Sequence, residues 1–276
     1  MKNRKRFRIL RIVLLAIIVI CLVPIGQTYS LSLQHKKQQK ELKNNLKTKK
    51  NLTESQNTPT EEPEMAADLT ALYQQNNDFI GWLSIDGTNI DYPVMQSKDD
   101  DYYLNHNFYK EEDRYGSLFV KEIADVKTPG TNVIIYGHNM KDGSMFGDLD
   151  CYKEQSYYKK HTLISFETLS ENRTYEIMAV FPSQVSEEKN SFQYYQFYQA
   201  DTKEEFLQFY ENVKAYSLYD TGITAEFGDT FLTLSTCDNH TENGRFVVVA
   251  KRIEHNIFYT GINHLIFHTK TPNYLH

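Results

Sequence analysis

The chain has 276 residues, 40% of them hydrophobic, and a formal net charge of −6 that hides an uneven distribution. Residues 1–50 hold 13 Lys or Arg and one acid, whereas residues 51–276 hold 17 basic and 35 acidic residues. Because nucleic-acid binding relies on clustered Lys and Arg, the acidic remainder argues against it, and the basic start beside an apolar run indicates a membrane instead.

The cysteine count excludes several kinds of site. Cys21, Cys151 and Cys237 form no C-x-x-C pair and no metal-ligand spacing. The sequence also has no Gly-x-Ser-x-Gly elbow, phosphate loop or dinucleotide fingerprint. We therefore expect no disulfide framework, no metal and no cofactor. The acidic run at residues 99–101 lacks the alternation of a calcium loop, so we interpret it as a solvated turn.

The first 33 residues combine a basic tail, residues 1–8, with an apolar segment, residues 9–33. Residues 12–33 are long enough to cross a hydrocarbon core as a helix. The positive charges before them predict a single-pass protein of the cell membrane, with a cytoplasmic N-terminus and an extracellular remainder. A cleaved signal peptide begins in the same way, but no clear small-x-small cleavage site follows, so we favour an uncleaved anchor.

Residues 34–64 are polar and are expected to form a solvated stalk and linker, without enough apolar residues for a core. The composition of a folded domain begins at residue 65, and we place that domain at residues 65–254. Its first predicted element is a short amphipathic helix over residues 65–76. Residues 255–276 run past the last expected strand, and their aromatic-rich sequence indicates no role.

Short runs of strand-like composition, separated by Gly, Asp, Asn and Pro, follow in this domain. The expected strands are residues 81–85, 89–94, 116–120, 132–136, 162–166, 174–181, 230–236 and 245–253. Residues 144–160 are expected to form one or two short helices, and residues 201–219 a longer helix that Thr202 can cap. The pattern predicts a mainly β fold with peripheral helices, as a barrel or a sandwich.

Cys237 ends the apolar strand at residues 231–236 and is the candidate nucleophile. A thiol attacks only as the thiolate, so it needs a nearby cation or imidazole. A lone cysteine is more often buried and inert, and that interpretation fits Cys151.

His138 is the candidate proton shuttle, because it ends the apolar run at residues 133–136 and follows Gly137, which allows a sharp turn. His106 and His240 are weaker alternatives. Alone, each of these histidines is more simply interpreted as a surface residue.

Arg245 opens the last strong strand, eight positions after Cys237. That spacing is enough for a loop that returns the chain antiparallel, which would bring a permanent cation beside the thiol. Alone, Arg245 is more simply a strand-end residue in a surface ion pair. Together, a Cys, a His and an Arg in these positions indicate thiolate acyl transfer.

Several stretches of the sequence resemble one known family, the class B sortases, which are cell-wall cysteine transpeptidases of Gram-positive bacteria. The stretches that carry chemistry are residues 233–237 with 245–250, and residues 135–140. Residues 79–85 leading to 90–94, and residues 102–108 leading to 116–119, resemble the same class. The helix at residues 201–219 matches the insertion that class B has between its sixth and seventh strands. The resemblance covers residues 68–253.

The resemblance implies a closed eight-stranded β-barrel with an N-terminal helix and a long helix between the sixth and seventh strands. It implies Cys237 as nucleophile, His138 as acid and base, and Arg245 as a clamp for the oxyanion and the substrate. Cys237 would attack the Thr carbonyl in a C-terminal sorting signal of the Asn-Pro-x-Thr type on a secreted protein. An amine of a peptidoglycan precursor or cross-bridge would then resolve the thioacyl enzyme.

By family position, the residues that bind the substrate are Leu104, Ser235 and Thr236. Asp100 stands where the class often has Asn, so that contact is not transferred. Three alternatives stay open: a sortase that polymerises pilins through a Lys nucleophile, a thiol peptidase that releases the acyl group to water, and an anchored extracellular binding or scaffold protein in which Cys237 is inert.

Overall fold

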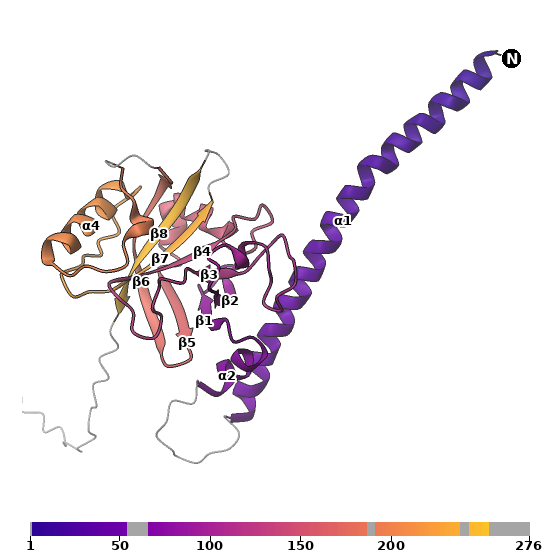
Figure 1. Ribbon diagram of the computed structural model, residues 1–276. Coiled ribbons are helices and arrows are strands. Elements are labelled where there is room, and N and C mark those ends of the chain that lie inside the picture. The colour runs from indigo at the N-terminus through magenta and orange to yellow at the C-terminus, as the bar shows by residue number, and fades with distance from the viewer. Residues whose placement is uncertain (1, 54–65, 187–190, 238–242, 254–276) are drawn as a thin grey trace, which may run out of the picture.

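Eight strands close into one barrel, in the order β1-β2-β3-β4-β7-β8-β6-β5, in the computed structural model of the chain (Figure 1). The structure describes residues 2–53, 66–186, 191–237 and 243–253. The strands are β1 Phe79–Ser84, β2 Asp91–Gln96, β3 Leu118–Val120, β4 Asn132–Gly137, β5 Leu163–Thr168, β6 Asn172–Gln184, β7 Phe231–Cys237 and β8 Gly244–Ile253. The predicted mainly β fold with a closed eight-stranded barrel is confirmed. Residues 255–276 lie outside the described part of the chain.

The interior of the barrel is filled by alternate side chains, because successive residues of a strand point to opposite faces. On β7, Leu232 and Leu234 belong to the interior cluster, and on β8, Phe246 and Val248 do. All four are fully buried. The residues between them therefore face outward, and this outer face carries the candidate site.

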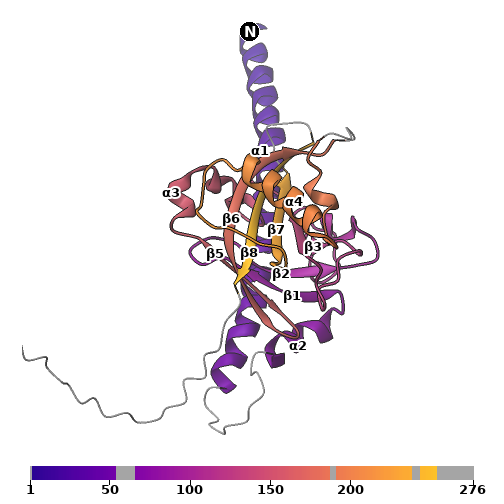
Figure 2. The ribbon, with the colours of Figure 1, turned by 90° about the vertical axis from the view of Figure 1, so that its left-hand side faces the viewer.

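Helix α4, Lys203–Tyr216, covers part of the outer face (Figure 2). It begins after Thr202, whose hydroxyl accepts a hydrogen bond from the Glu205 N–H at 3.2 Å, while the Glu205 carboxylate accepts one from the Thr202 N–H at 3.1 Å. This reciprocal cap explains why the helix starts there. The predicted helix at residues 201–219 is confirmed, although it is shorter at both ends. Its apolar side and the strands beneath share one cluster, which includes Phe206, Phe209, Val213, Phe231, Val247 and Val249.

Four shorter helical elements flank the barrel. Residues 144–160 contain η2, Gly147–Lys153, and α3, Gln155–Tyr158, as expected of one or two short helices. Two further turns, η1 Tyr102–Leu104 and η3 Tyr194–Gln196, were not predicted. Both supply side chains to the candidate site.

The N-terminal part consists of two helices, α1 Lys2–Thr53 and α2 Ala66–Gln75. The expectation of a solvated stalk from residue 34 is wrong for residues 34–46, because this part of α1 lies along the domain (Figure 1). Residues 54–64, the remainder of the predicted linker, lie outside the described residues.

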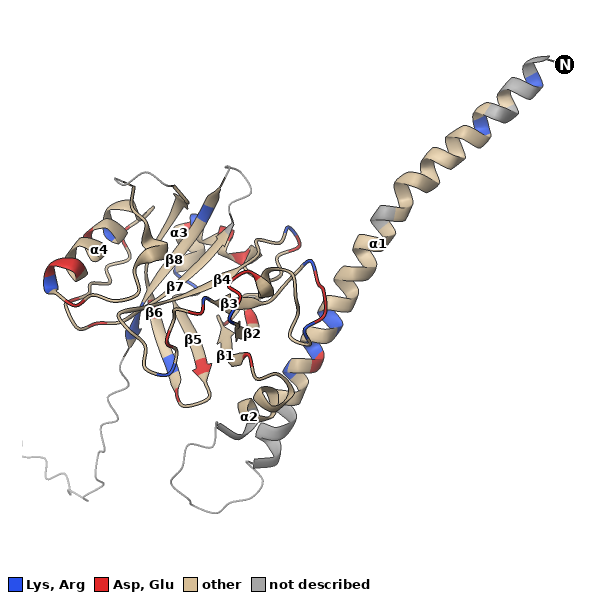
Figure 3. Cartoon of the chain, in the orientation of Figure 1, with Lys and Arg blue, Asp and Glu red and all other residues tan. Residues whose placement is uncertain are grey.

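The packing of α1 explains this difference. Leu42 is fully buried in a cluster with Leu69 and Leu72 of α2, and His35, seven positions earlier on the same helix face, is also buried. Basic residues of α1 lie beside acidic residues of the domain (Figure 3), and Lys43 forms an ion pair with Asp91. A few buried contacts at helical spacing are enough to dock a helix that is polar on average.

The first half of α1 has a different surface. Its apolar residues at positions 10–23 and 29–33 are exposed. By length and composition, the helix is apolar enough over Leu10–Leu46 to cross a membrane.

Candidate active site

Three strand ends meet at one edge of the barrel. β4 and β7 are parallel neighbours with Gly137 paired to Thr236, so the next residues, His138 and Cys237, follow side by side. β7 and β8 are antiparallel, and Cys237 is paired with Arg245. Because neighbouring strands lie about 4.8 Å apart, the register alone puts the backbone of Cys237 between those of His138 and Arg245.

The register also relates these positions to the outer face of the barrel. Leu234 belongs to the interior cluster, so the backbone position of Cys237, three residues further along β7, is on the outer-face register. His138 directly follows Gly137, the last residue of β4. The same alternation on β8 places Arg245 on the outer face. The predicted trio is therefore brought together by the strand register.

His138 is oriented by a residue far away in the sequence. Its Nε2 atom lies 2.7 Å from the carbonyl oxygen of Leu104, at the end of η1. A carbonyl oxygen can only accept, so Nε2 carries a proton and donates it. The other ring nitrogen, Nδ1, is then the atom that can exchange a proton with a reacting group.

Gly137 allows this end of β4 to pack closely. A Cβ at this position would lie 2.4 Å from Leu118 and 2.9 Å from Phe146. The sequence suggested a sharp turn as the reason for glycine, but the φ angle of Gly137 is not positive, and the reason is steric. Close packing of β4 against these side chains fixes the position from which His138 leaves the strand.

A pocket of about 270 Å³ lies on the outer face beside the strand ends. Leu104 and Ser235, two of the three predicted substrate-binding residues, line it together with Arg245. The rest of its wall comes from Asp100, Asp101, Phe119, Lys121, Tyr136, Gly137, Val185, Tyr194 and Tyr195. Both polar and apolar side chains are available to a ligand there.

Thr236 does not line this pocket. Ser235 and Thr236 are equally buried, but Thr236, as the neighbour of Ser235, faces the interior side of β7. The expectation that the Thr236 side chain contacts substrate therefore has no support in the geometry. Family position could not distinguish the two faces, because Ser235 and Thr236 are adjacent.

Ser235 connects β7 to the segment between β6 and β7. Its Oγ atom is 2.8 Å from the hydroxyl of Tyr194 in η3, and both side chains are buried. This hydrogen bond fixes one wall of the pocket to the strand that carries Cys237.

Arg245 is half-buried, and its Nη1 atom donates to the Gly244 carbonyl at 2.9 Å. This bond uses one of the five donors of a guanidinium. It also limits the rotation of the planar group at the pocket wall.

Tyr136 contributes a neutral phenol to the pocket. Burial raises its pKa well above the ordinary value, and the neighbouring Tyr198 raises it further. Tyr136 therefore stays protonated near neutral pH and can act there as a hydrogen-bonding group, but not as a base.

Neither of the other candidates in the described part of the chain, Cys151 and His106, lines this pocket. Cys151 is an exposed residue, so the interpretation of a buried cysteine is wrong for it. Partial desolvation of its thiol, together with Asp148 and Asp150, raises its pKa. His106 stacks on Tyr102 with ring centroids 3.9 Å apart. His240 lies outside the described residues.

Sequence reasoning missed the aromatic and charged wall of the pocket. Tyr194 and Tyr195 lie more than 40 positions before Cys237, among the 20 tyrosines of the chain, and nothing local marks them. Asp100 and Asp101 were interpreted as a solvated turn, yet both line the pocket. The stretch at residues 102–108 was a usable signal, because it resembled the family and contains Leu104, the last residue of η1.

Comparison with known proteins identifies the family. A model of the sortase domain matches residues 83–253. The sortase B of Listeria monocytogenes is 39% identical over 192 residues, which cover 69% of this chain and 76% of that protein. The chain belongs to the sortase family, in class B. It is accordingly a cysteine transpeptidase of the kind that anchors proteins to the cell wall.

Two solved structures resemble this sortase closely. A Staphylococcus aureus sortase B–substrate complex superposes with a TM-score of 0.70 at 27% sequence identity. The match covers 80% of this chain and 97% of the chain in that complex. A sortase B complexed with triglycine superposes with a TM-score of 0.71 at 26% identity, and covers 80% and 98%. The predicted class B membership and enzyme type are thus confirmed.

Proposed function

We propose that this sortase is anchored in the membrane and cleaves a C-terminal sorting signal of the Asn-Pro-x-Thr type after Thr, with Cys237 as nucleophile, His138 as acid and base, and Arg245 as clamp. It then transfers the acyl group to an amine of peptidoglycan. The observation that carries this proposal is the register that pairs Gly137 with Thr236 and Cys237 with Arg245.

In the first step, the sulfur of Cys237 attacks the carbonyl carbon of Thr and forms a tetrahedral intermediate. The C–N bond then breaks, the leaving amine takes a proton from His138 Nδ1, and a thioester remains on Cys237. The proton on Nδ1 is the one released by the thiol. His138 Nε2 keeps its proton throughout, because the Leu104 carbonyl holds it.

In the second step, an amine attacks the thioester carbon and loses a proton to His138 Nδ1. The C–S bond breaks, the new amide leaves, and the thiolate of Cys237 is regenerated. Atoms and charges balance, since the proton given to the first amine is recovered from the second.

Arg245 is proposed to stabilise the negative charge that develops on the carbonyl oxygen in both steps. The guanidinium lies in the pocket wall on the strand paired with β7, and it is always charged. Preorganised donors of this kind contribute about 3–4 kcal/mol to transition-state stabilisation. Arg245→Lys keeps the charge and loses the planar fork, so it tests geometry separately from charge.

The acceptor is proposed to be a primary amine on a peptidoglycan precursor or cross-bridge. The solved relative that contains triglycine supports this class of acceptor, and the relative solved with substrate supports a peptide in the pocket. Leu104 and Ser235, which line the pocket here, are the proposed peptide contacts.

The membrane topology is proposed from the sequence and supported by the exposed apolar half of α1. Lys and Arg before the apolar segment favour a cytoplasmic N-terminus and an extracellular catalytic domain. In that topology, secreted proteins and peptidoglycan precursors meet the enzyme at the outer membrane face.

Mass spectrometry of the purified chain after incubation with candidate sorting peptides tests the proposal. We expect a thioacyl adduct on Cys237 and, with added triglycine, an amide product in place of the hydrolysed acid. Cys237→Ala is the control and should form neither. Adduct formation with release only to water would favour a thiol peptidase, and transfer to a Lys side chain in preference to triglycine would favour pilin polymerisation.

A further inference from the structure

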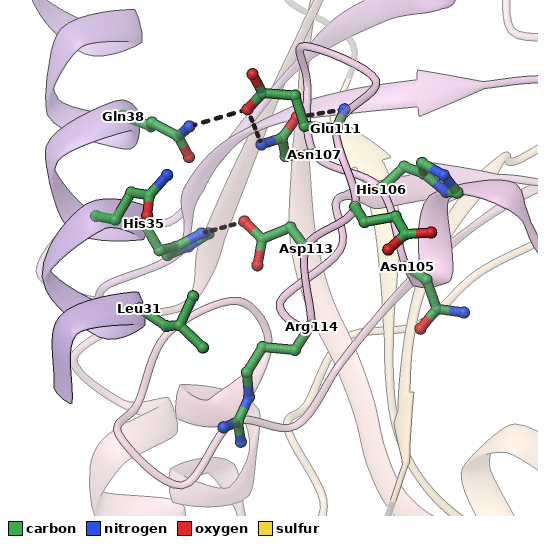
Figure 4. A pocket seen from close by; sticks show the side chains of 11 residues that line it. Leu31, His35, Gln38, Asn105, His106, Asn107, Glu111, Asp113 and Arg114 are labelled. Carbon is green, nitrogen blue, oxygen red and sulfur yellow. Dashed lines mark hydrogen bonds and ion pairs between the residues drawn. The ribbon is translucent and has the colours of Figure 1, made fainter. Parts of the chain in front are cut away.

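The second half of α1 contacts the segment that follows η1 (Figure 4). His35 is 2% exposed and stacks on the ring of Tyr115, with centroids 4.2 Å apart. Its Nδ1 atom lies 3.5 Å from Oδ2 of Asp113. A second contact joins Gln38 to Glu111 at 3.4 Å. These two polar contacts cross a pocket of about 660 Å³ between the helix and residues 105–114.

Asp113 links the helix to the backbone near the active site. One carboxylate oxygen faces His35, and the other accepts a hydrogen bond from the Tyr115 N–H at 2.9 Å. The N–H of Asp113 itself donates to the carbonyl of Asn105 at 2.9 Å. Burial alone would raise the pKa of Asp113, but the nearby His35 ring and the Tyr115 N–H hold it below its usual value. Asp113 is thus an ionised anchor.

Asn105 directly follows Leu104, whose carbonyl oxygen holds His138. The same stretch is fixed from its other side, because the N–H of Ser117 donates to the Tyr103 carbonyl at 2.9 Å and its Oγ donates to the His106 carbonyl at 3.0 Å. The Leu104 carbonyl therefore has little freedom to move while the contacts of Asp113 and Ser117 are in place.

We propose that His35 is a positioning residue: through Asp113 and Asn105 it holds the Leu104 carbonyl in the place where it orients His138. The catalytic centre then depends on a helix that begins in the membrane segment and lies outside the barrel. This inference rests on the proposed role of His138 in catalysis.

Loss of the contact between His35 and Asp113 should lower the catalytic rate. Without the His35–Asp113 contact, the Leu104 carbonyl shifts and the His138 ring is less well oriented toward Cys237. Misplacement of a catalytic group by about 1 Å can cost about 100-fold in rate. We expect a partial displacement to lower kcat by about tenfold while KM changes by less than about twofold, because Leu104 is the one residue of the pocket lining that shifts.

The experiment uses the full chain in detergent micelles, with a sorting peptide of the Asn-Pro-x-Thr type and triglycine. His35→Leu and Asp113→Asn remove the contact from either side, and His35→Gln restores an N–H donor that can reach Asp113. The matched control is Lys43→Met, which breaks the ion pair with Asp91 on the same helix and has no connection to Leu104. Each variant is measured for kcat, KM, melting temperature and the rate of Cys237 alkylation.

The proposal predicts that His35→Leu and Asp113→Asn lower kcat and slow the alkylation of Cys237 by similar factors. The double variant, with both substitutions, should lose no more kcat than either single variant. His35→Gln should recover part of the lost kcat. Lys43→Met should leave kcat unchanged. Unchanged kcat in His35→Leu despite a lower melting temperature would show a purely structural role and overturn the proposal, as would an equal loss in Lys43→Met. Absence of a thioacyl adduct in the unsubstituted chain would instead contradict the proposed function itself.

Discussion

The carbonyl oxygen of Leu104 accepts a hydrogen bond from Nε2 of His138 at 2.7 Å. This contact fixes the tautomer of the imidazole and leaves Nδ1 for proton exchange. A backbone shift near Leu104 should therefore change the geometry of the proposed catalytic site, even if each of its proposed catalytic side chains is retained.

Gly116→Ala should therefore reduce activity. Gly116 has a φ of +58°, and a Cβ there would lie 2.5 Å from the Tyr103 carbonyl oxygen and 2.6 Å from that of Leu104. We expect a fall in the free energy of unfolding of about 1–3 kcal/mol and a larger relative loss in kcat. The control is Gly222→Ala, at φ +79° with nothing within 4 Å of the added Cβ. Equal kcat losses in the two variants would contradict the steric explanation.

The hydrogen bond between Tyr194 and Ser235 should stabilise the pocket wall. Tyr194→Phe and Ser235→Ala each leave a buried hydroxyl without this partner, so each should lower the free energy of unfolding by about 1 kcal/mol. The double variant should cost less than the sum, which urea unfolding can measure. Tyr216→Phe, at a site 51% exposed, serves as the control and should change stability little. Strict additivity of the two substitutions would show that the bond contributes nothing.

The two cysteines outside the N-terminal apolar segment should differ in reactivity. Partial desolvation and the nearby Asp148 and Asp150 raise the pKa of the Cys151 thiol, which disfavours its thiolate. Cys237, between a histidine and an arginine, should be alkylated by iodoacetamide at pH 7 at least about tenfold faster. Peptide mapping by mass spectrometry gives both rates in one sample. Slower labelling of Cys237 than of Cys151 would favour the scaffold interpretation.

Glu171 should make stability depend on pH. It accepts from Arg173 Nε at 2.7 Å and pairs with Arg252, and although burial opposes ionisation, these contacts hold the pKa of Glu171 below its ordinary value. A lowered folded pKa stabilises the protein above the unfolded pKa, near 4.5, and this contribution is lost as the pH falls through the folded pKa.

Glu171→Gln should accordingly destabilise the protein at pH 7, by about 1–2 kcal/mol, because the buried Arg173 loses its charged partner. Thermal unfolding of both proteins between pH 3 and pH 7 checks the sign. The difference in melting temperature should shrink toward pH 3, and a difference that is constant over this range would refute the assignment.

The N-terminal segment should remain on the mature protein. Detection of peptides from residues 1–8 in the membrane fraction, by mass spectrometry of the expressed chain, checks this expectation. Alkaline carbonate should not extract the protein, because an apolar helix stays in the bilayer. A mature N-terminus that begins after residue 25 would indicate a cleaved signal peptide instead.

Much of the barrel could be predicted because its strands are marked locally, by β-branched and apolar runs between turn residues. The catalytic trio could be proposed because each member stands next to such a run, and the observed register brings Cys237 and His138 to one edge. Even so, the sequence alone could not decide between Ser235 and Thr236, since adjacent residues differ only in the face they occupy.

Other features depend on contacts between distant segments and could not be predicted. The Leu104 carbonyl acts through its backbone, so its side chain gives no signal of the contact with His138. His35 and Leu42 are buried within a stretch of mostly polar residues, because a helix needs few contacts to dock. The average composition of the helix is polar, so it gives no sign that these two residues are buried.

Helix α1 is continuous from Lys2 to Thr53, and its second half is fixed to the domain at His35, Leu42 and Lys43. An α-helix rises about 1.5 Å per residue, so the stretch from Leu31 to Leu42 spans about 17 Å. In the proposed topology, this rod sets the height of the catalytic pocket above the bilayer. A secreted substrate must then present its scissile bond at that height, so the reach of the segment that carries its sorting signal becomes a criterion for substrate selection.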